Sequence, residues 1–124
     1  MKDSQNAVKQ FHQAFDLTIG DTPMIREPEL RATLIDEEAN ETTYAIMHGD
    51  LVGAIDGMCD LIYVVLGTAV AFGIDLEPFF WEIHRSNMSK VGGTKNALGK
   101  LVKPPTYSPP RIAQLLKSAR GSSR

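Results

Sequence analysis

The sequence has little cysteine, little excess of either charge and no apparent export signal, and each scarcity excludes a class of protein. A single cysteine, Cys59, cannot form an internal disulfide, which argues against a disulfide-stapled secreted scaffold. Lys plus Arg total 13 against 15 Asp plus Glu, and the net charge of −2 disfavours a nucleic-acid partner. The opening residues MKDSQNAVKQ lack the apolar core of a signal peptide, so we expect a cytoplasmic protein.

Long hydrophobic runs are also missing. The uncharged run from Leu61 to Ile74 is shorter than the ~20 residues that a membrane helix needs, so we expect a buried helix and no membrane partner. This helix is apolar nearly all round and needs neighbours on every side, more than one short chain supplies. The sequence therefore predicts self-association, as a homodimer or a dimer of dimers.

What is present is typical of one globular domain. The 124 residues are 43% apolar and 23% charged. Apolar spacing, caps and breakers predict helices over about 3–17, 29–48, 50–72 and 75–90, followed by a segment rich in Gly and Pro and a short helix from Arg111. We predict an all-α fold: a four-to-five-helix bundle forming a single domain over 1–124, with its helical core at about 3–90 and a Pro/Gly-rich tail at about 91–120.

Three residues should mark the ends of these helices. Gly49 is placed as the C′ residue of the second helix, Asp50 as the N-cap of the third, and Gly73 at the end of the third. Asp75 is expected to cap the fourth helix, whose apolar side chains should turn inward; they are Phe79, Phe80, Trp81 and Ile83.

Two sets of carboxylates stand out on the second and third predicted helices. Glu37, Glu38 and Glu41 lie within just over one turn, and Asp56 and Asp60 lie four residues apart on one stripe. An antiparallel pairing of the two helices would bring the sets together. A solvated, purely structural acidic face is the alternative.

Asp60 and the local shortage of cations favour a metal site. Asp60 precedes the apolar run LIYVV and should be partly buried, which is costly for an unpaired charge, and the sequence has no Lys or Arg between Arg31 and Arg85. Carboxylates without nearby Cys or His suit a hard ion, Mg²⁺ or Mn²⁺, that takes further oxygens from substrate phosphates. The sequence therefore predicts a magnesium site with two or three ions, and a structural polar seam remains the alternative.

The sequence resembles the all-α nucleoside triphosphate pyrophosphohydrolases, a group that includes MazG-like proteins, phosphoribosyl-ATP pyrophosphohydrolases and dimeric dUTPases. The resemblance rests on three stretches: the EExxE pattern of Glu37, Glu38 and Glu41, the stretch DLIYVVLGTAVAFGID from Asp60, and HRSNMSK from His84 to Lys90. The second metal motif of these families is ExxD. This sequence has Gly57 at the place of its glutamate, and Asp56 is the only substitute.

The resemblance implies Mg²⁺-dependent hydrolysis of the bond between the α- and β-phosphates of a nucleotide, which releases a monophosphate and pyrophosphate. It implies metal ligation by the acidic set, with Glu38 assigned as the general base; the set is Glu37, Glu38, Glu41 and Asp60, with Asp56 as the substitute for the missing glutamate. Nucleotide-pool housekeeping is the expected role. The alternatives are phosphoribosyl-ATP hydrolysis in histidine biosynthesis and a non-catalytic helical interaction module.

Residues near the end of the fourth helix are candidates for binding substrate phosphates. Asn87 and Lys90 lie three apart and can face one phosphate, with Arg85 and Lys95 as further donors. Cations also favour helix C-termini for purely structural reasons. Tyr63, within one turn of Asp60, is either a contact for the base or ribose or a core aromatic.

Overall fold

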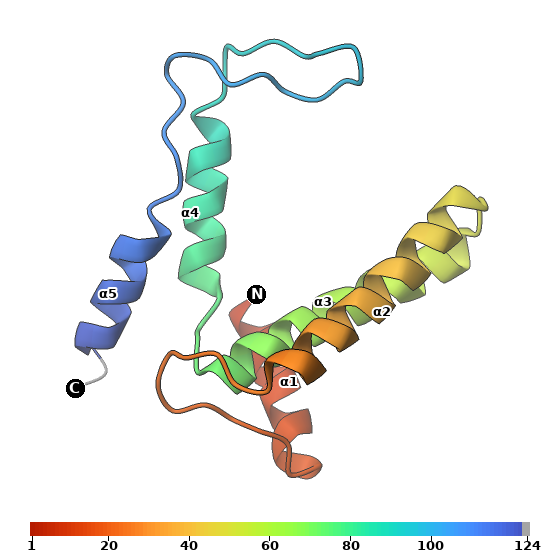
Figure 1. The fold of residues 1–124 in the computed structure, drawn as a ribbon, viewed down its shortest axis with the longest axis vertical. Helices are drawn as coiled ribbons and strands as arrows, with labels where there is room; N and C mark the ends of the chain where they lie inside the picture. Colours follow the sequence, from red (N-terminus) through yellow and green to blue (C-terminus); the bar gives the residue numbers. More distant parts are fainter. Residues whose placement is uncertain (123–124) are drawn as a thin grey trace. The chain divides into compact units, whose positions relative to one another are not determined.

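The computed structural model describes residues 1–122 and contains five helices (Figure 1). They are α1 (Lys2–Ala14), α2 (Pro28–Met47), α3 (Leu51–Phe72), α4 (Glu77–Met88) and α5 (Ile112–Ser122). Among these residues the only β-type pairing is an isolated bridge between Lys95 and Leu101. The predicted all-α fold and its five helices are confirmed.

The described chain forms two compact units, Met1–Leu76 and Glu77–Arg124. The first holds α1, α2 and α3, and the second holds α4, the tail and α5. A single domain over the whole chain stays a prediction.

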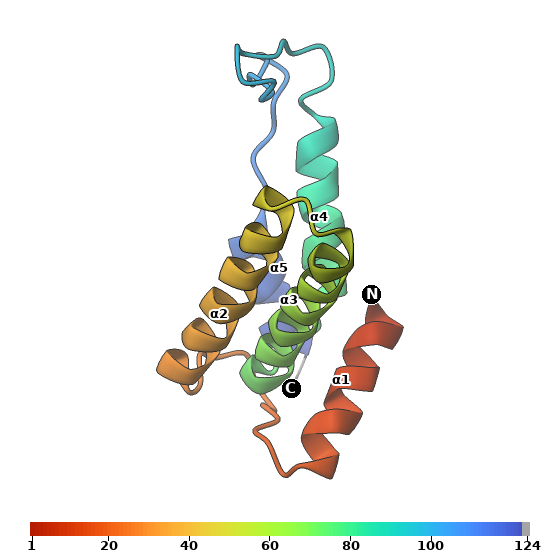
Figure 2. The same cartoon turned by 90° about the vertical axis from the view of Figure 1, so that its right-hand side faces the viewer.

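The first unit is an antiparallel α2–α3 hairpin with α1 packed on the other side of α3 (Figure 2). The turn follows the predicted chemistry: Gly49 has φ +69°, and the Asp50 side chain accepts a 2.9 Å hydrogen bond from the Gly53 amide at the start of α3. Gly73, also at φ +69°, ends α3. Local sequence therefore fixes both ends of the central helix.

α1 ends three residues earlier than predicted. Asp16 adopts a left-handed backbone conformation, and the buried His12 ring contacts the Thr18 carbonyl through Nδ1 at 2.8 Å. At the other end, the Gln5 side chain donates to the Ile74 carbonyl at 2.6 Å and accepts from the Leu76 amide at 3.0 Å. Side-chain contacts to distant backbone, rather than local spacing, therefore set the position of α1.

Small residues let α2 and α3 approach closely. A Cβ atom at Gly57 would lie 2.5 Å from the Thr42 Oγ1 atom and 2.9 Å from the Thr42 Cα atom. The buried Arg31 guanidinium crosses the same interface, where it donates 3.0 Å hydrogen bonds to the Thr68 hydroxyl and the Val64 carbonyl. Arg31 is the one Lys or Arg of the hairpin, and these hydrogen bonds already engage its guanidinium.

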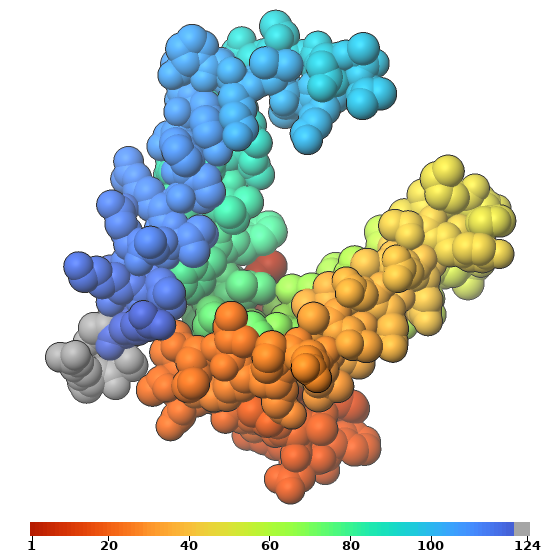
Figure 3. Space-filling model, viewed as in Figure 1, coloured from red at the N-terminus to blue at the C-terminus, as the bar shows by residue number. Residues whose placement is uncertain are grey.

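The apolar helix α3 is only partly enclosed by this chain. One stripe along it is exposed and consists of Leu51, Ile55, Met58 and Ile62. The hairpin tip, yellow in Figure 3, is also bare, with Met47 81% exposed. By length and composition α3 could cross a membrane, with 22 residues and a mean hydropathy of 1.7, a test that core helices of soluble proteins also pass. Its assignment as a core helix stays a prediction.

One expectation for α4 is wrong. The helix begins at Glu77, within two residues of the predicted start, and the capping role of Asp75 stays a prediction. Phe80, Trp81 and Ile83 are exposed rather than turned inward, because this 12-residue helix packs in its unit only against α5 and the tail.

Candidate functional site: a carboxylate cluster on the α2–α3 hairpin

The α2 carboxylates lie where that helix faces α3. Glu37 and Glu41 are exposed, whereas Glu38 is half-buried. The Glu38 Oε2 atom is fully buried, and no hydrogen-bond donor among residues 1–122 reaches it. An unpartnered carboxylate oxygen is costly to bury, so this atom marks a place where the chain alone leaves a charge unsatisfied.

The expectation that Asp60 is partly buried is wrong. Asp60 and Asp56 are both exposed, on a stripe of α3 beside the hairpin interface. The reason is the helix crossing, because α3 presents Gly57 rather than Asp60 to α2. Glu38 takes the inward position instead.

The other four acids lie close enough to Glu38 to act on its carboxylate. Burial raises the pKa of Glu38 above its ordinary value, and the charges of Glu41, Asp60, Glu37 and Asp56 raise it further, in that order. In the described part of the chain, no Lys or Arg forms an ion pair with any of the five. The hairpin therefore gathers negative charge without a protein cation to balance it.

This cluster fits a hydrated divalent cation. Within residues 1–122, no group of three or more His, Cys, Asp or Glu side chains is placed so that it could hold a metal ion as a cage of protein ligands. Mg²⁺ rarely uses such a cage: it is usually held by one or two carboxylates and completes its shell with waters and phosphate oxygens. The buried Oε2 atom of Glu38 and its four acidic neighbours supply the hard oxygen donors that such an ion needs.

The close contact between α2 and α3 explains why this sequence has a glycine in place of the glutamate of the ExxD motif. Gly57, at the place of the motif's glutamate, packs directly on Thr42, where no side chain fits. Asp56 lies one residue earlier and is near enough to contribute to the raised pKa of Glu38. Asp56 is therefore the α3 carboxylate available beside Asp60.

Aromatic rings lie on both sides of the acids along the hairpin. Tyr63 packs edge-on against Phe11 of α1, with ring centroids 5.7 Å apart, and remains partly exposed. On α2, Tyr44 and His48 stack at 3.9 Å. Sequence reasoning missed this pair, although positions 37, 41, 44 and 48 follow the helical repeat and share one face of α2.

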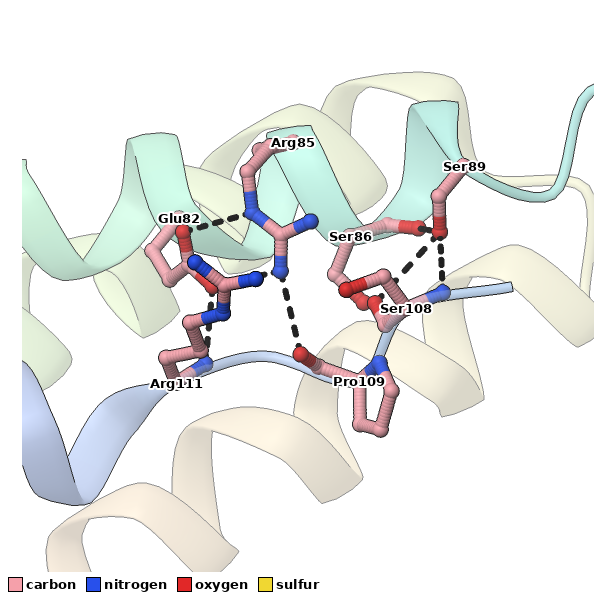
Figure 4. A network of polar contacts seen from close by, with 7 residues as sticks. All are labelled: Glu82, Arg85, Ser86, Ser89, Ser108, Pro109 and Arg111. Atoms are coloured by element: carbon pink, nitrogen blue, oxygen red, sulfur yellow. Dashed lines mark hydrogen bonds and ion pairs between the residues drawn. The ribbon is translucent and has the colours of Figure 1, made fainter. Parts of the chain in front are cut away.

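The candidate phosphate donors of the second unit have different surroundings. Arg85 is engaged: its guanidinium donates to both Glu82 carboxylate oxygens, at 2.8 and 2.7 Å, and to the Pro109 carbonyl at 3.0 Å (Figure 4). Lys90 donates a 3.0 Å hydrogen bond to the Asn87 side chain. Lys95 is exposed, in the turn closed by its bridge to Leu101. Arg85 is therefore a structural clamp in this unit, while Asn87 and Lys90 act as a pair.

Glu82 is the centre of this clamp. Hydrogen bonds from the Arg85 side chain and then the Arg111 amide lower the pKa of Glu82 from 4.5 to about 2. Since this pKa is below its ordinary value, ionised Glu82 stabilises the unit above about pH 4.5, and the contribution is lost as the pH falls towards 2.

We therefore expect the Glu82 carboxyl carbon to titrate near pH 2 in an NMR titration. Over the same pH range the Arg111 amide should lose its protection, because protonated Glu82 is a poorer acceptor. The Glu82→Gln variant should show weak Arg111 protection at neutral pH and no further loss on acidification. A wild-type carboxyl that titrates near 4.5 would contradict the clamp.

Most of the first unit and most of α4 match a known protein family. The family model described as phosphoribosyl-ATP pyrophosphohydrolase matches residues 8–87. The matched span contains α2, α3 and all five carboxylates of the cluster. No curated protein matches this chain.

Proposed function

This chain belongs to the phosphoribosyl-ATP pyrophosphohydrolase family, within the all-α nucleoside triphosphate pyrophosphohydrolase superfamily, and from this membership we propose a Mg²⁺-dependent nucleoside triphosphate pyrophosphohydrolase. Pyrophosphohydrolase activity follows from the family itself. The proposal adds the substrate, a nucleoside triphosphate cleaved between its α- and β-phosphates, and a housekeeping role for the nucleotide pool in the cytoplasm.

One observation carries the proposal: a buried, unpartnered carboxylate oxygen on Glu38 with four more acids around it. A structural acidic face would leave its carboxylates in water, whereas this arrangement buries one of them at a cost. A divalent cation that brings its own waters offsets that cost.

We assign the acids by their surroundings. Glu37, Glu41, Asp60 and Asp56 are exposed, and in this proposal they hold Mg²⁺, or Mn²⁺ as a substitute. A metal held by these residues would supply positive charge to the triphosphate and a more acidic water. Glu38 then accepts a proton from the attacking water. The water oxygen bonds to phosphorus while the bond to the departing pyrophosphate breaks.

The raised pKa of Glu38 suits this role. A general base works best when its pKa lies near the operating pH, and burial with four acidic neighbours shifts Glu38 in that direction.

Phosphate contacts are proposed for the end of α4. Asn87 and Lys90, already hydrogen-bonded to each other, would bind the triphosphate, with Lys95 as a further donor. Arg85 is proposed to act indirectly, because its guanidinium is already held by Glu82 and Pro109. Tyr63, exposed one turn after Asp60, remains the proposed contact for the base or ribose.

A pyrophosphate-release assay tests the proposal and its alternatives together. Purified protein with Mg²⁺ should release pyrophosphate from one or more common or modified nucleoside triphosphates. Turnover of phosphoribosyl-ATP alone would favour the histidine-biosynthesis activity. Absence of release from every substrate would leave the non-catalytic helical module. Protein carrying Glu41→Gln, prepared identically, controls for contaminating hydrolases.

We also propose that the protein is a homodimer or a dimer of dimers, with neither nucleic acid nor membrane as a partner. The exposed α3 stripe of Leu51, Ile55, Met58 and Ile62 is the surface that a second copy would cover. Burying one such side chain contributes about 1.5–3 kcal/mol.

Sedimentation at micromolar concentration should therefore show an assembly of at least two 13.6 kDa chains. Ile55→Lys should shift it towards monomer, since a charge is costly in an apolar interface. Thr33→Lys places the same charge on an exposed position of α2 away from the stripe and should leave the assembly unchanged. A compact wild-type monomer would contradict this proposal.

A further inference from the structure

The tail of the second unit is fixed to α4 by a series of hydrogen bonds. The Ser89 hydroxyl accepts from the Ser108 amide at 2.8 Å, and the Thr106 hydroxyl donates to the Ser89 carbonyl at 3.3 Å. Further along, the Arg85 and Glu82 side chains hold Pro109 and Arg111 (Figure 4). Residues 103–111, which we call the strap, therefore have a defined position along α4.

The strap brings a second lysine to the end of α4. The Lys103 ammonium lies 4.7 Å from the centroid of the Tyr107 ring, and the Lys90 ammonium lies 5.7 Å from the same centroid. Both distances are within the range of a cation–π contact. Tyr107 is half-buried, and its amide donates to the Pro104 carbonyl at 3.0 Å, which fixes the ring in a turn.

Two ammonium groups therefore share the Tyr107 ring. Within residues 1–122 neither Lys90 nor Lys103 forms an ion pair. The acid of the hydrogen-bond network that holds the strap, Glu82, is already engaged by Arg85 and Arg111. The ring attracts both cations but carries no net charge, so their mutual repulsion remains uncompensated by the chain.

A multivalent anion is the ligand that this arrangement suits. A pyrophosphoryl group carries several negative oxygens and accepts from two ammonium groups at once, and charge-assisted hydrogen bonds are the strong ones. The Asn87 side chain, bonded to Lys90, offers an amide donor beside them.

We propose that Lys103 and Lys90, gathered on the Tyr107 ring by the strap, form a binding site for a pyrophosphoryl group, either within a bound triphosphate or as the free product. This inference rests on the proposed function for its ligand, and it adds Lys103 as a phosphate contact that the sequence analysis did not identify. Tyr107, Glu82 and Arg85 are positioning residues, because they hold the lysines and the strap.

Binding of inorganic tripolyphosphate by calorimetry tests the site without turnover. With EDTA present, metal cannot bridge the ligand to the carboxylates. We expect Lys103→Ala to weaken binding about 10-fold, the lower end for one charge-assisted contact at an exposed site. Lys100→Ala removes the same charge from the same tail, at an exposed position outside the Tyr107 contact, and should change binding less than about twofold.

Two tyrosine variants separate the ring from its hydroxyl. Tyr107→Phe keeps the ring and should retain wild-type affinity, whereas Tyr107→Leu should lose affinity because the lysines are no longer held together. Equal losses for Lys103→Ala and Lys100→Ala would overturn the proposal, since they would show only a general effect of charge.

The outcome is independent of enzyme activity. Binding that depends on Lys103 in a protein that releases no pyrophosphate would support this site and reject the proposed function. Pyrophosphate release together with unchanged tripolyphosphate binding in Lys103→Ala would do the reverse. Helix content by circular dichroism confirms that each variant is folded.

Discussion

Glu41→Gln and Asp60→Asn should each abolish Mg²⁺-dependent release of pyrophosphate while leaving the helices intact. Both changes remove an oxygen charge from the proposed metal site and keep the side-chain shape. We expect a loss of at least about 100-fold in kcat/KM, because disturbing even the indirect partners of a metal costs 10- to 100-fold. The measurement is pyrophosphate release at saturating Mg²⁺, with circular dichroism on the same samples.

Stability should move in the opposite direction in these variants. Removing one charge from a group of five acids relieves repulsion, so the metal-free melting temperature should stay the same or rise. Asp36→Asn is the matched control: Asp36 is an exposed acid of α2 that does not contribute to the raised pKa of Glu38. Wild-type activity in either cluster variant, or equal loss in the control, would reject the site assignment.

The largest expected loss of stability is at Gly57. A methyl group there would overlap both the side chain and the Cα atom of Thr42, and backbone cannot move without shifting α2. Overpacking of this kind costs about 1–3 kcal/mol. For a unit of this size each kcal/mol lowers the melting temperature by roughly 4–8 °C.

Thermal melting of Gly57→Ala measures this cost. Cys59→Ala, at an exposed position of the same helix, should stay within about 0.5 kcal/mol of wild type. An unchanged melting temperature for Gly57→Ala would show that α2 and α3 are not in close contact at this point. The larger Gly57→Glu change, which introduces the ExxD motif, should be more destabilising still.

Sequence reasoning succeeded where local chemistry decides the structure. Gly49, Asp50 and Gly73 mark the helix ends because a left-handed turn or a capping carboxylate needs only its immediate neighbours. The grouping of acids on two adjacent helices followed from helical spacing and one short turn. These features depend on residues a few positions apart.

Sequence reasoning failed where the burial of a side chain depends on how two helices cross. The apolar run after Asp60 predicted that this carboxylate is partly buried, but α3 packs on α2 through Gly57, Asp60 is exposed, and Glu38 holds the buried oxygen. The outward Phe80 and Trp81 of α4 have the same origin, since apolar composition does not specify which neighbour is present. How two helices cross depends on the surfaces of both, so the spacing within one helix does not determine which of its side chains are buried.

Part of the environment of Arg85 could have been predicted from the sequence. Glu82 lies three residues before it, a spacing at which helix side chains meet, so the ion pair could have been foreseen. Its contact with the Pro109 carbonyl spans 24 residues of irregular tail, and nothing local indicates it. The place of a residue in a motif therefore does not show whether its side chain is already engaged in other hydrogen bonds.

The segment between Ser89 and Ser108, which the strap closes into a loop, can be lengthened at little cost in stability. The bond between Ser89 and Ser108 joins residues 19 positions apart, and the segment between them contains Leu98, 92% exposed near a turn glycine. Doubling the length of a flexible loop costs only about 0.6 kcal/mol in closure entropy. An insertion beside Leu98 would disturb the hydrogen bonds that the Asn96 side chain accepts from the Leu98 and Lys100 amides, but it would leave the bond between Ser89 and Ser108 in place. We therefore expect the unit to tolerate an epitope or a fluorescent label there. The turn around Leu98 is thus a natural attachment point for reporters of this protein.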